Sequence, residues 1–171
     1  MLPLKEATAE KHKIAERMPF NVKMFRGQLS PEEYGLYLVQ LREIFKTIEE
    51  KGTPHPALNR VAAIDKDLSE LPSNGYTVLH STRRYADYLN GLDYSGVLPH
   101  IYLQYLAVMF GGQLMKKSVP SSGHMYDFDH MQEAMLSIRA LQQDTWADEV
   151  NKGFDFTIEI FRELDETATI S

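Results

Sequence analysis

The chain has 171 residues, of which 43% are hydrophobic and 25% charged, as in an ordinary globular protein. We expect a single domain over residues 1–171, long enough to bury a sizeable core. The net charge of −6 argues against a nucleic-acid partner. The absence of cysteine excludes a disulfide scaffold, a zinc–thiolate site and a cysteine nucleophile, and it fits the cytoplasmic location that we expect.

The N-terminal segment predicts an amphipathic helix over residues 2–18, which Pro19 ends or kinks. His12 and Glu16 lie one helical turn apart, so the carboxylate can reach an imidazole nitrogen. A carboxylate on one ring nitrogen fixes the tautomer and aims the other nitrogen outward, as in a metal-ligating histidine. These residues alone favour a common surface His–Glu pair over a metal ligand.

The next helix has a clear start signal, in which Ser30 is the N-cap, Pro31 takes the first helical position and two acids follow. We expect this helix to run to about Lys51 and to end at Gly52. The remaining pattern predicts a short helix at 57–64, a polar, turn-rich segment at 65–75, a helix at 81–90, a loop at 119–123, and helices at 129–141 and 145–166.

The segment from Pro99 to Ser118 is the most apolar run of the chain, yet it contains adjacent glycines at 111 and 112. Each glycine costs a helix interior roughly 0.8–1 kcal/mol relative to alanine. The pair therefore indicates a close approach to the bare backbone, either by another helix or by a flat apolar ligand. Polar residues within the run favour a buried helix over a membrane span, so no membrane partner is expected.

No alternating β pattern and no internal repeat is present, so we predict an all-α fold of roughly six to eight helices. Glu-x-x-His, His-Glu-x-x-His, Gly-x-Gly-x-x-Gly, the P-loop and Gly-x-Ser-x-Gly are all absent. We expect the histidines other than His12 to be solvated or to cap helices rather than to bind a ligand. They are His55, His80, His100, His124 and His130.

Two segments resemble the signature segments of the heme oxygenase family. LKEATAEKHKIAERMPFNVKMFRGQ (Leu4–Gln28) is similar to the family's LKEAT-x-x-x-H with a glutamate four residues on. YLQYLAVMFGGQLMKK (Tyr102–Lys117) is similar to YTRYLGDLSGGQ-x-x-KK. Weaker similarity runs in the same order through most of the chain. The resemblance implies a single-domain helical bundle that holds heme between a proximal N-terminal helix and a glycine-kinked distal helix.

The resemblance also implies the site residues. His12 matches the proximal ligand of the heme iron, and Glu16 matches its hydrogen-bonding partner. Lys5 and Arg139 match the partners of the two heme propionates. The catalytic distal side would include Gln104, Gly111 and Gly112, and the other implied heme contacts are Thr8, Met24, Tyr102, Ala107, Val108, Phe154 and Phe161.

The activity implied is that of an enzyme which binds heme b as substrate and cofactor together. It would open the ring with O2 and external electrons, giving biliverdin, CO and Fe²⁺. A ferredoxin or a flavin reductase would supply the electrons. A basic docking patch for that donor could come from Lys5, Arg83, Arg84, Lys116 and Lys117.

The distal side departs from the family in several polar positions. Val108 stands where the family commonly has an aspartate that holds a water network, and Gln104 and Phe45 replace an arginine and a tyrosine. Ala107 replaces a glycine. The replacement of these polar residues together predicts a pocket that holds less water and has a different hydrogen-bond network. It leaves open a peroxidase-like protein or a non-catalytic heme-binding or heme-trafficking protein, and a third alternative is a related all-α protein acting on another small aromatic molecule.

Overall fold

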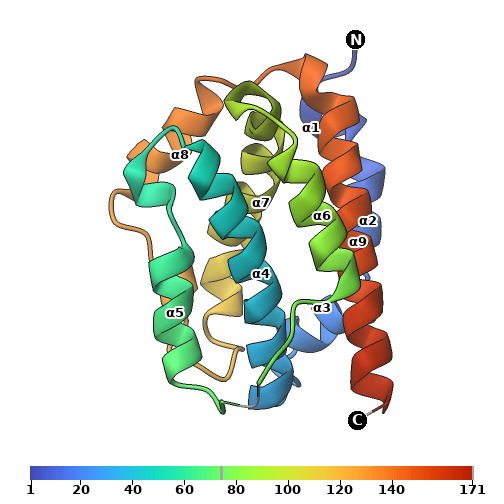
Figure 1. The fold of residues 1–171 in the computed structure, drawn as a ribbon. Coiled ribbons are helices and arrows are strands. Elements are labelled where there is room, and N and C mark those ends of the chain that lie inside the picture. The colour runs from blue at the N-terminus through green and yellow to red at the C-terminus, as the bar shows by residue number, and fades with distance from the viewer. Residues whose placement is uncertain (74, 171) are drawn as a thin grey trace.

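The computed structural model describes residues 1–73 and 75–170, without the side chains of 168–170. Within these residues every regular element is a helix, which confirms the all-α prediction (Figure 1). In chain order they are α1 (Leu4–Ala7), α2 (Ala9–Glu16), α3 (Pro19–Phe25), α4 (Pro31–Lys51), η1 (Pro56–Leu58), α5 (Val61–Ser69), α6 (His80–Asn90), α7 (Tyr94–Met115), η2 (His124–Tyr126), α8 (Met131–Arg139), η3 (Asp144–Trp146) and α9 (Ala147–Ile170).

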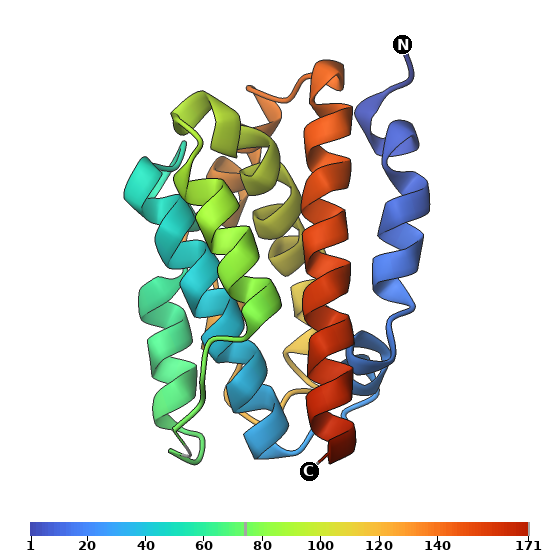
Figure 2. The same cartoon turned by 45° about the vertical axis from the view of Figure 1, so that its right-hand side comes forward.

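The long helices α4, α6, α7 and α9 form the body of the bundle. Helix α7 packs against α4 and α9, while α6 bridges α4 and α9 on another side. Helix α5 lies against α4 at one edge, and α2 lies against α9 at the opposite edge (Figure 2). The N-terminal helices are therefore attached to the bundle mainly through α9.

Helix α4 begins where the sequence predicts. The Ser30 hydroxyl accepts from the Glu33 backbone N–H at 3.1 Å, and the Glu33 carboxylate accepts from the Ser30 N–H at 2.9 Å. This reciprocal pair satisfies two amides that lack helical partners. Gly52 ends the helix with a φ of +117°, a conformation open to glycine but strained for other residues.

The N-terminal helix differs from the prediction, because residues 2–18 do not form one element. Thr8 has φ −111° and ψ 1° and separates α1 from α2. Its hydroxyl donates to the Leu4 carbonyl at 2.9 Å, and such back-bonding bends helices. The break predicted at Pro19 is confirmed, since this proline starts α3.

The segment predicted as a short helix at 57–64 followed by turns is also different. A 3-10 turn occupies Pro56–Leu58, and α5 continues to Ser69. The polar sequence was misleading because Asp67, fully buried, takes hydrogen bonds from a loop more than fifty residues away.

A second, smaller hydrophobic core joins the N-terminal helices to α7 and α9. It consists of Leu4, Ala15, Leu103, Val150, Phe154 and Ile158. This cluster sets how far α2 lies from α7, and so it determines the space between them.

Candidate functional site

Helix α7 presents an apolar face that the other described residues leave uncovered. Phe110 is 57% exposed and Leu114 is 60% exposed, and Ala107 and Gly111 are also exposed. Their spacing of three, four and seven residues places all four on one side of the helix. An exposed apolar face of this kind marks a binding surface rather than ordinary surface scatter.

The two glycines of α7 have different surroundings. A Cβ added at Gly111 would meet no atom within 4 Å, whereas one at Gly112 would lie 2.5 Å from Cδ1 of Tyr126. Gly112 therefore lets the chain's own η2 pack against α7, as in the helix-packing alternative. Gly111 keeps bare backbone on the uncovered face, as the ligand alternative requires.

His12 lies on the exposed side of α2, and its side chain is 60% exposed. Its Nε2 is 3.1 Å from Oε1 of Glu16, so the predicted pair is formed. The ring also lies against Phe154 of α9, with centroids 5.7 Å apart. Since Glu16 takes one ring nitrogen, the other is the one available to a metal ion.

The implied contacts on α1, α3 and α9 are buried in the cores. The Thr8 hydroxyl bonds to its own helix, and Met24 is only 2% exposed. Phe154 and Phe161 are each 7% exposed, and Phe161 stacks on Tyr37 at 6.1 Å. In this structure these residues form the packed wall behind the site rather than its open surface.

Arg139 lies at the edge of the exposed face of α7. Its guanidinium carbon is 5.6 Å from the ring centroid of Phe110 and 6.0 Å from that of Tyr102. The arginine side chain is exposed at the end of α8. This position suits a partner for an anionic group on a ligand that lies over the apolar face.

The sequence model of the heme oxygenase family matches residues 2–163. The chain belongs to the heme oxygenase family. It is 26% identical to mouse heme oxygenase 2 and 29% identical to chicken heme oxygenase 1, in both cases over 98% of this chain. The chain spans 66% of the length of the mouse protein and 70% of that of the chicken protein.

Solved structures of heme oxygenases have the same fold. Heme oxygenase-1 from Synechocystis sp. PCC6803, described in complex with heme, gives a TM-score of 0.81 at 22% identity and covers 98% of this chain and 94% of its own. The heme oxygenase from Leptospira interrogans gives 0.79 at 21% identity, covering 94% of this chain and 97% of its own.

The residues predicted to replace distal polar groups of the family are apolar or bonded within the bundle. Val108 is 8% exposed, and Phe45 is fully buried with its ring edge-on to Tyr105 at 4.8 Å. The Gln104 amide nitrogen donates to the Tyr85 hydroxyl at 3.3 Å and to the Thr157 hydroxyl at 3.0 Å. Gln104 is thus one end of a polar chain inside the bundle.

His100 corrects an expectation, because it is neither solvated nor a cap. It is fully buried, with Nδ1 2.7 Å from the Tyr85 hydroxyl and Nε2 2.9 Å from Oε1 of Glu149. Burial lowers the pKa of His100 below its ordinary value. Two polar residues, His100 and Gln104, stand one helical turn apart within an apolar run. This spacing could have indicated that both make hydrogen bonds inside the bundle. By contrast, His55 does cap a helix, accepting from the Ala57 N–H at 3.0 Å.

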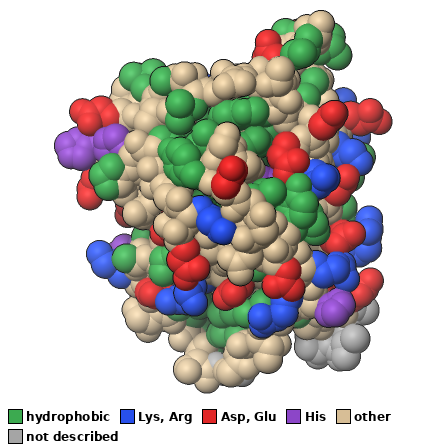
Figure 3. Space-filling model, turned by 45° about the horizontal axis from the view of Figure 1, so that its top comes forward, with side chains coloured by type: hydrophobic (Ala, Val, Ile, Leu, Met, Phe, Trp, Pro, Cys, Tyr) green, Lys and Arg blue, Asp and Glu red, His purple; other side chains and the backbone are tan. Residues whose placement is uncertain are grey.

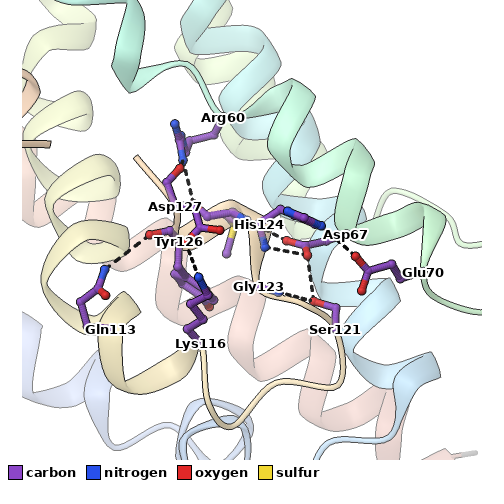
Figure 4. A network of polar contacts seen from close by, with 11 residues as sticks. Arg60, Asp67, Glu70, Gln113, Lys116, Ser121, Gly123, His124, Tyr126 and Asp127 are labelled. Carbon is purple, nitrogen blue, oxygen red and sulfur yellow. Dashed lines mark hydrogen bonds and ion pairs between the residues drawn. The ribbon is translucent and has the colours of Figure 1, made fainter. Parts of the chain in front are cut away.

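The C-terminal end of α7 is braced by the loop that follows it (Figure 4). Lys116 pairs with Asp127, and Arg60, only 5% exposed, donates to the carbonyls of Met125 and Asp127. Because Tyr126 lies under Gly112, this loop supports α7 from the side opposite the exposed face. No local pattern in the sequence predicts these contacts between the loop and α7.

Asp67 and Glu70 of α5 fasten the same loop. Asp67 accepts from the N–H groups of His124 and Met125 at 2.8 Å and from the Ser121 hydroxyl at 2.9 Å. Glu70 accepts from Ser122 and pairs with His124. Asp67, Glu70 and His124 are spaced closely enough for a metal ion, but these hydrogen bonds already explain both carboxylates.

The basic residues predicted for a docking patch come from three parts of the chain. Lys5 lies on α1, Lys116 and Lys117 follow α7, and Arg83 and Arg84 lie on α6. Arg84 is paired with Glu159 at 2.7 Å. On the face shown in Figure 3, basic and acidic side chains alternate around a group of hydrophobic ones. Among the described residues, no helix is both long enough and apolar enough to cross a membrane.

Proposed function

We propose that this chain binds heme between α2 and the exposed face of α7 and opens its ring to biliverdin, CO and Fe²⁺, using O2 and external electrons. The observation that carries the proposal is the exposed His12–Glu16 pair on one wall, together with bare backbone at Gly111 on the other. An exposed pair of this type contributes little to stability, about 0–1 kcal/mol, so folding does not account for it.

The residues divide into three roles in this proposal. His12 ligates the iron, and Glu16 holds the second ring nitrogen and raises the basicity of the ligand. Arg139 and Lys5 pair with the propionates, which sets how the heme is rotated in its site. Bound heme supplies the iron that reacts with O2.

The distal wall excludes water from the site. Ala107, Phe110 and Gly111 offer apolar surface and bare backbone, and Val108 adds an aliphatic side chain where the family commonly has an acid. A ring lying against this wall is held by burial of apolar area rather than by polar groups. A ferredoxin or a flavin reductase would donate electrons at the exposed edge beside Arg139.

The direct test adds hemin to the purified protein and then ascorbate, or a ferredoxin system, with catalase present. We expect the Soret band of histidine-ligated heme, followed by its decay as the broad red band of biliverdin grows. His12→Ala should lose the ligated spectrum and the conversion. His80→Ala, which changes an exposed histidine at the start of α6, is the matched control and should retain both.

A non-catalytic heme-binding protein is the second candidate, and the apolar Val108 favours it. It predicts a stable Soret band without bilin. Val108→Asp then discriminates between the candidates, since a restored acid should alter the rate or the site of ring opening only in a protein that already carries out the reaction. If hemin produces no Soret shift at all, both candidates are wrong.

A further inference from the structure

A continuous line of hydrogen bonds leads from the surface of α9 to the distal helix. Glu149, whose side chain is 28% exposed, contacts Nε2 of His100 at 2.9 Å. Nδ1 of His100 is 2.7 Å from the Tyr85 hydroxyl, which in turn lies 3.3 Å from the amide nitrogen of Gln104. The amide nitrogen also reaches the Thr157 hydroxyl at 3.0 Å.

The direction of every hydrogen bond in this line follows from its two ends. The Glu149 carboxylate can only accept, so His100 donates from Nε2. Burial keeps the imidazole neutral, so Nδ1 is an acceptor and the Tyr85 hydroxyl donates to it. The Tyr85 oxygen must then accept, and the group that faces it on Gln104 is the N–H2 rather than the carbonyl.

The other end of the line agrees with this polarity. The Thr157 hydroxyl donates to the Gly153 carbonyl at 3.0 Å, so its oxygen accepts from Gln104. Both amide hydrogens of Gln104 are therefore engaged inside the bundle. The group that remains is its carbonyl oxygen. Gln104 precedes Ala107 and Gly111 by three and seven residues, which places it on the same side of α7 as the proposed heme site.

The charged and titratable groups around His100 favour one donor-to-acceptor direction along this line of hydrogen bonds. Tyr85 and Tyr88 face it from α6, and Glu149 and Lys152 face it from α9. Tyr88 donates to the same Glu149 oxygen as His100 does, and together with His100 it holds the pKa of Glu149 below its ordinary value although burial alone would raise it. Glu149 thus stays an acceptor.

We propose that Glu149, acting through His100 and Tyr85, is a positioning residue that turns the Gln104 carbonyl oxygen toward the heme. This inference rests on the proposed function. A fixed carbonyl oxygen accepts hydrogen bonds from water as a carboxylate oxygen does, so it supplies an acceptor on the wall where Val108 has none. The N–H2 group, if turned toward the heme, would instead donate.

The test uses the heme-loaded, reduced protein with CO and measures the infrared C–O stretch, which responds to the polarity of the nearest distal group. Tyr85→Phe removes one of the two hydroxyls that hold the Gln104 amide nitrogen, and Glu149→Gln replaces an obligatory acceptor by a group that can also donate. Each should therefore move the band to lower frequency or split it, because an N–H then faces the CO in part of the molecules. Tyr105→Phe is the matched control, since it removes the hydroxyl of an equally buried tyrosine, which donates to Glu49, on the helix that carries Gln104. It should leave the band in place.

A second variant assigns the effect to Gln104. In a Gln104→Leu background, Tyr85→Phe should cause no further shift, because no amide is left to turn. If heme binds and the band is unmoved in both Tyr85→Phe and Glu149→Gln, the proposal is wrong while the proposed function stands.

The heme-free protein gives a reading that does not depend on heme. In ¹⁵N NMR, His100 should be the neutral Nε2–H tautomer. The side-chain N–H2 of Gln104 should exchange slowly with solvent in the parent and faster in Tyr85→Phe. An Nδ1–H tautomer in the parent would overturn the proposal even if the protein binds no heme.

Discussion

In the proposed site Glu16 contacts His12 but not the heme, so its effect on heme binding should be partial. Residues that hold a metal-ligating histidine typically contribute about 10–100-fold in metal affinity or activity. Glu16→Ala should therefore weaken hemin binding by roughly that factor without abolishing the ligated spectrum. Hemin titration followed at the Soret band measures this, with Glu10→Ala on the same helix as the control. Equal affinity in Glu16→Ala and the parent would exclude the role of the pair.

The adjacent glycines predict opposite results from the same substitution. Gly111→Ala meets open space, so it should raise the free energy of unfolding of the heme-free protein by about 0.8–1 kcal/mol while weakening heme binding. Gly112→Ala drives a methyl group into the Tyr126 ring, so it should lower that free energy by about 1–3 kcal/mol. Urea denaturation and hemin titration of both variants provide the test. A lower free energy of unfolding in Gly111→Ala than in the parent would contradict the placement of Gly111 on the uncovered face of α7.

The sequence could reveal residues whose partners are close along the chain. His12 and Glu16 are one turn apart, so their pairing follows from helix geometry alone. His100 meets Glu149, 49 residues later, and Gln104 meets Thr157, 53 residues later. Such pairs exist only after the helices have packed, and no local pattern encodes them.

At the scale of elements, the hydrogen bonds of Asp67 and Glu70 should hold α5 and the loop after α7 together as one structural unit. Asp67→Ala leaves the N–H groups of His124 and Met125, the latter buried, without an acceptor, so it should lower the free energy of unfolding by about 1–3 kcal/mol. The exposed pair of Asp65 with Arg42 gives the control, because Asp65→Ala should cost about 0–1 kcal/mol. Hydrogen exchange should then rise at residues 121–126 in Asp67→Ala alone. Protection unchanged there would show that other contacts hold the loop.

The elements themselves were predicted where caps and prolines mark their ends. Ser30, Pro31 and Gly52 bound α4 as expected, and Asn90 ends α6 as expected. Residues 65–69 were misassigned because polar residues usually indicate a loop, whereas Asp67 is polar in order to bind another segment. A sequence pattern predicts the exposure that a residue type usually has, but it does not reveal a distant hydrogen-bonding partner that allows a polar residue to be buried.

For the whole molecule, the buried His100 makes stability depend on pH. Its pKa is below 6.5 in the folded state, so the unfolded chain takes up the proton first as the pH falls past that value. The free energy of unfolding should therefore begin to fall below about pH 6.5, before most carboxylates titrate. In His100→Gln, whose amide can also bridge Glu149 and Tyr85, this part of the decline should disappear.

Urea denaturation between pH 5 and 8 measures the decline, and His80→Gln at an exposed position is the control. Further acidification should destabilise the protein again through Glu149 and Glu163, whose pKa values lie below 4.5 in the folded state, where hydrogen bonds outweigh burial. A flat profile from pH 8 to 5 in the parent would contradict the assignment of His100 as a neutral buried ring.

Because α2 packs mainly against α9, the order of synthesis determines when the proposed site can form. Ribosomes add roughly 5–20 residues per second, so α9 emerges on the order of ten seconds after α2. Until then His12, the proposed iron ligand, lacks the Phe154 ring that it packs on, and the two walls of the proposed heme site have no common support. If heme binds at the proposed site, a nascent chain should not capture it early, and loading should follow the release of the last helix.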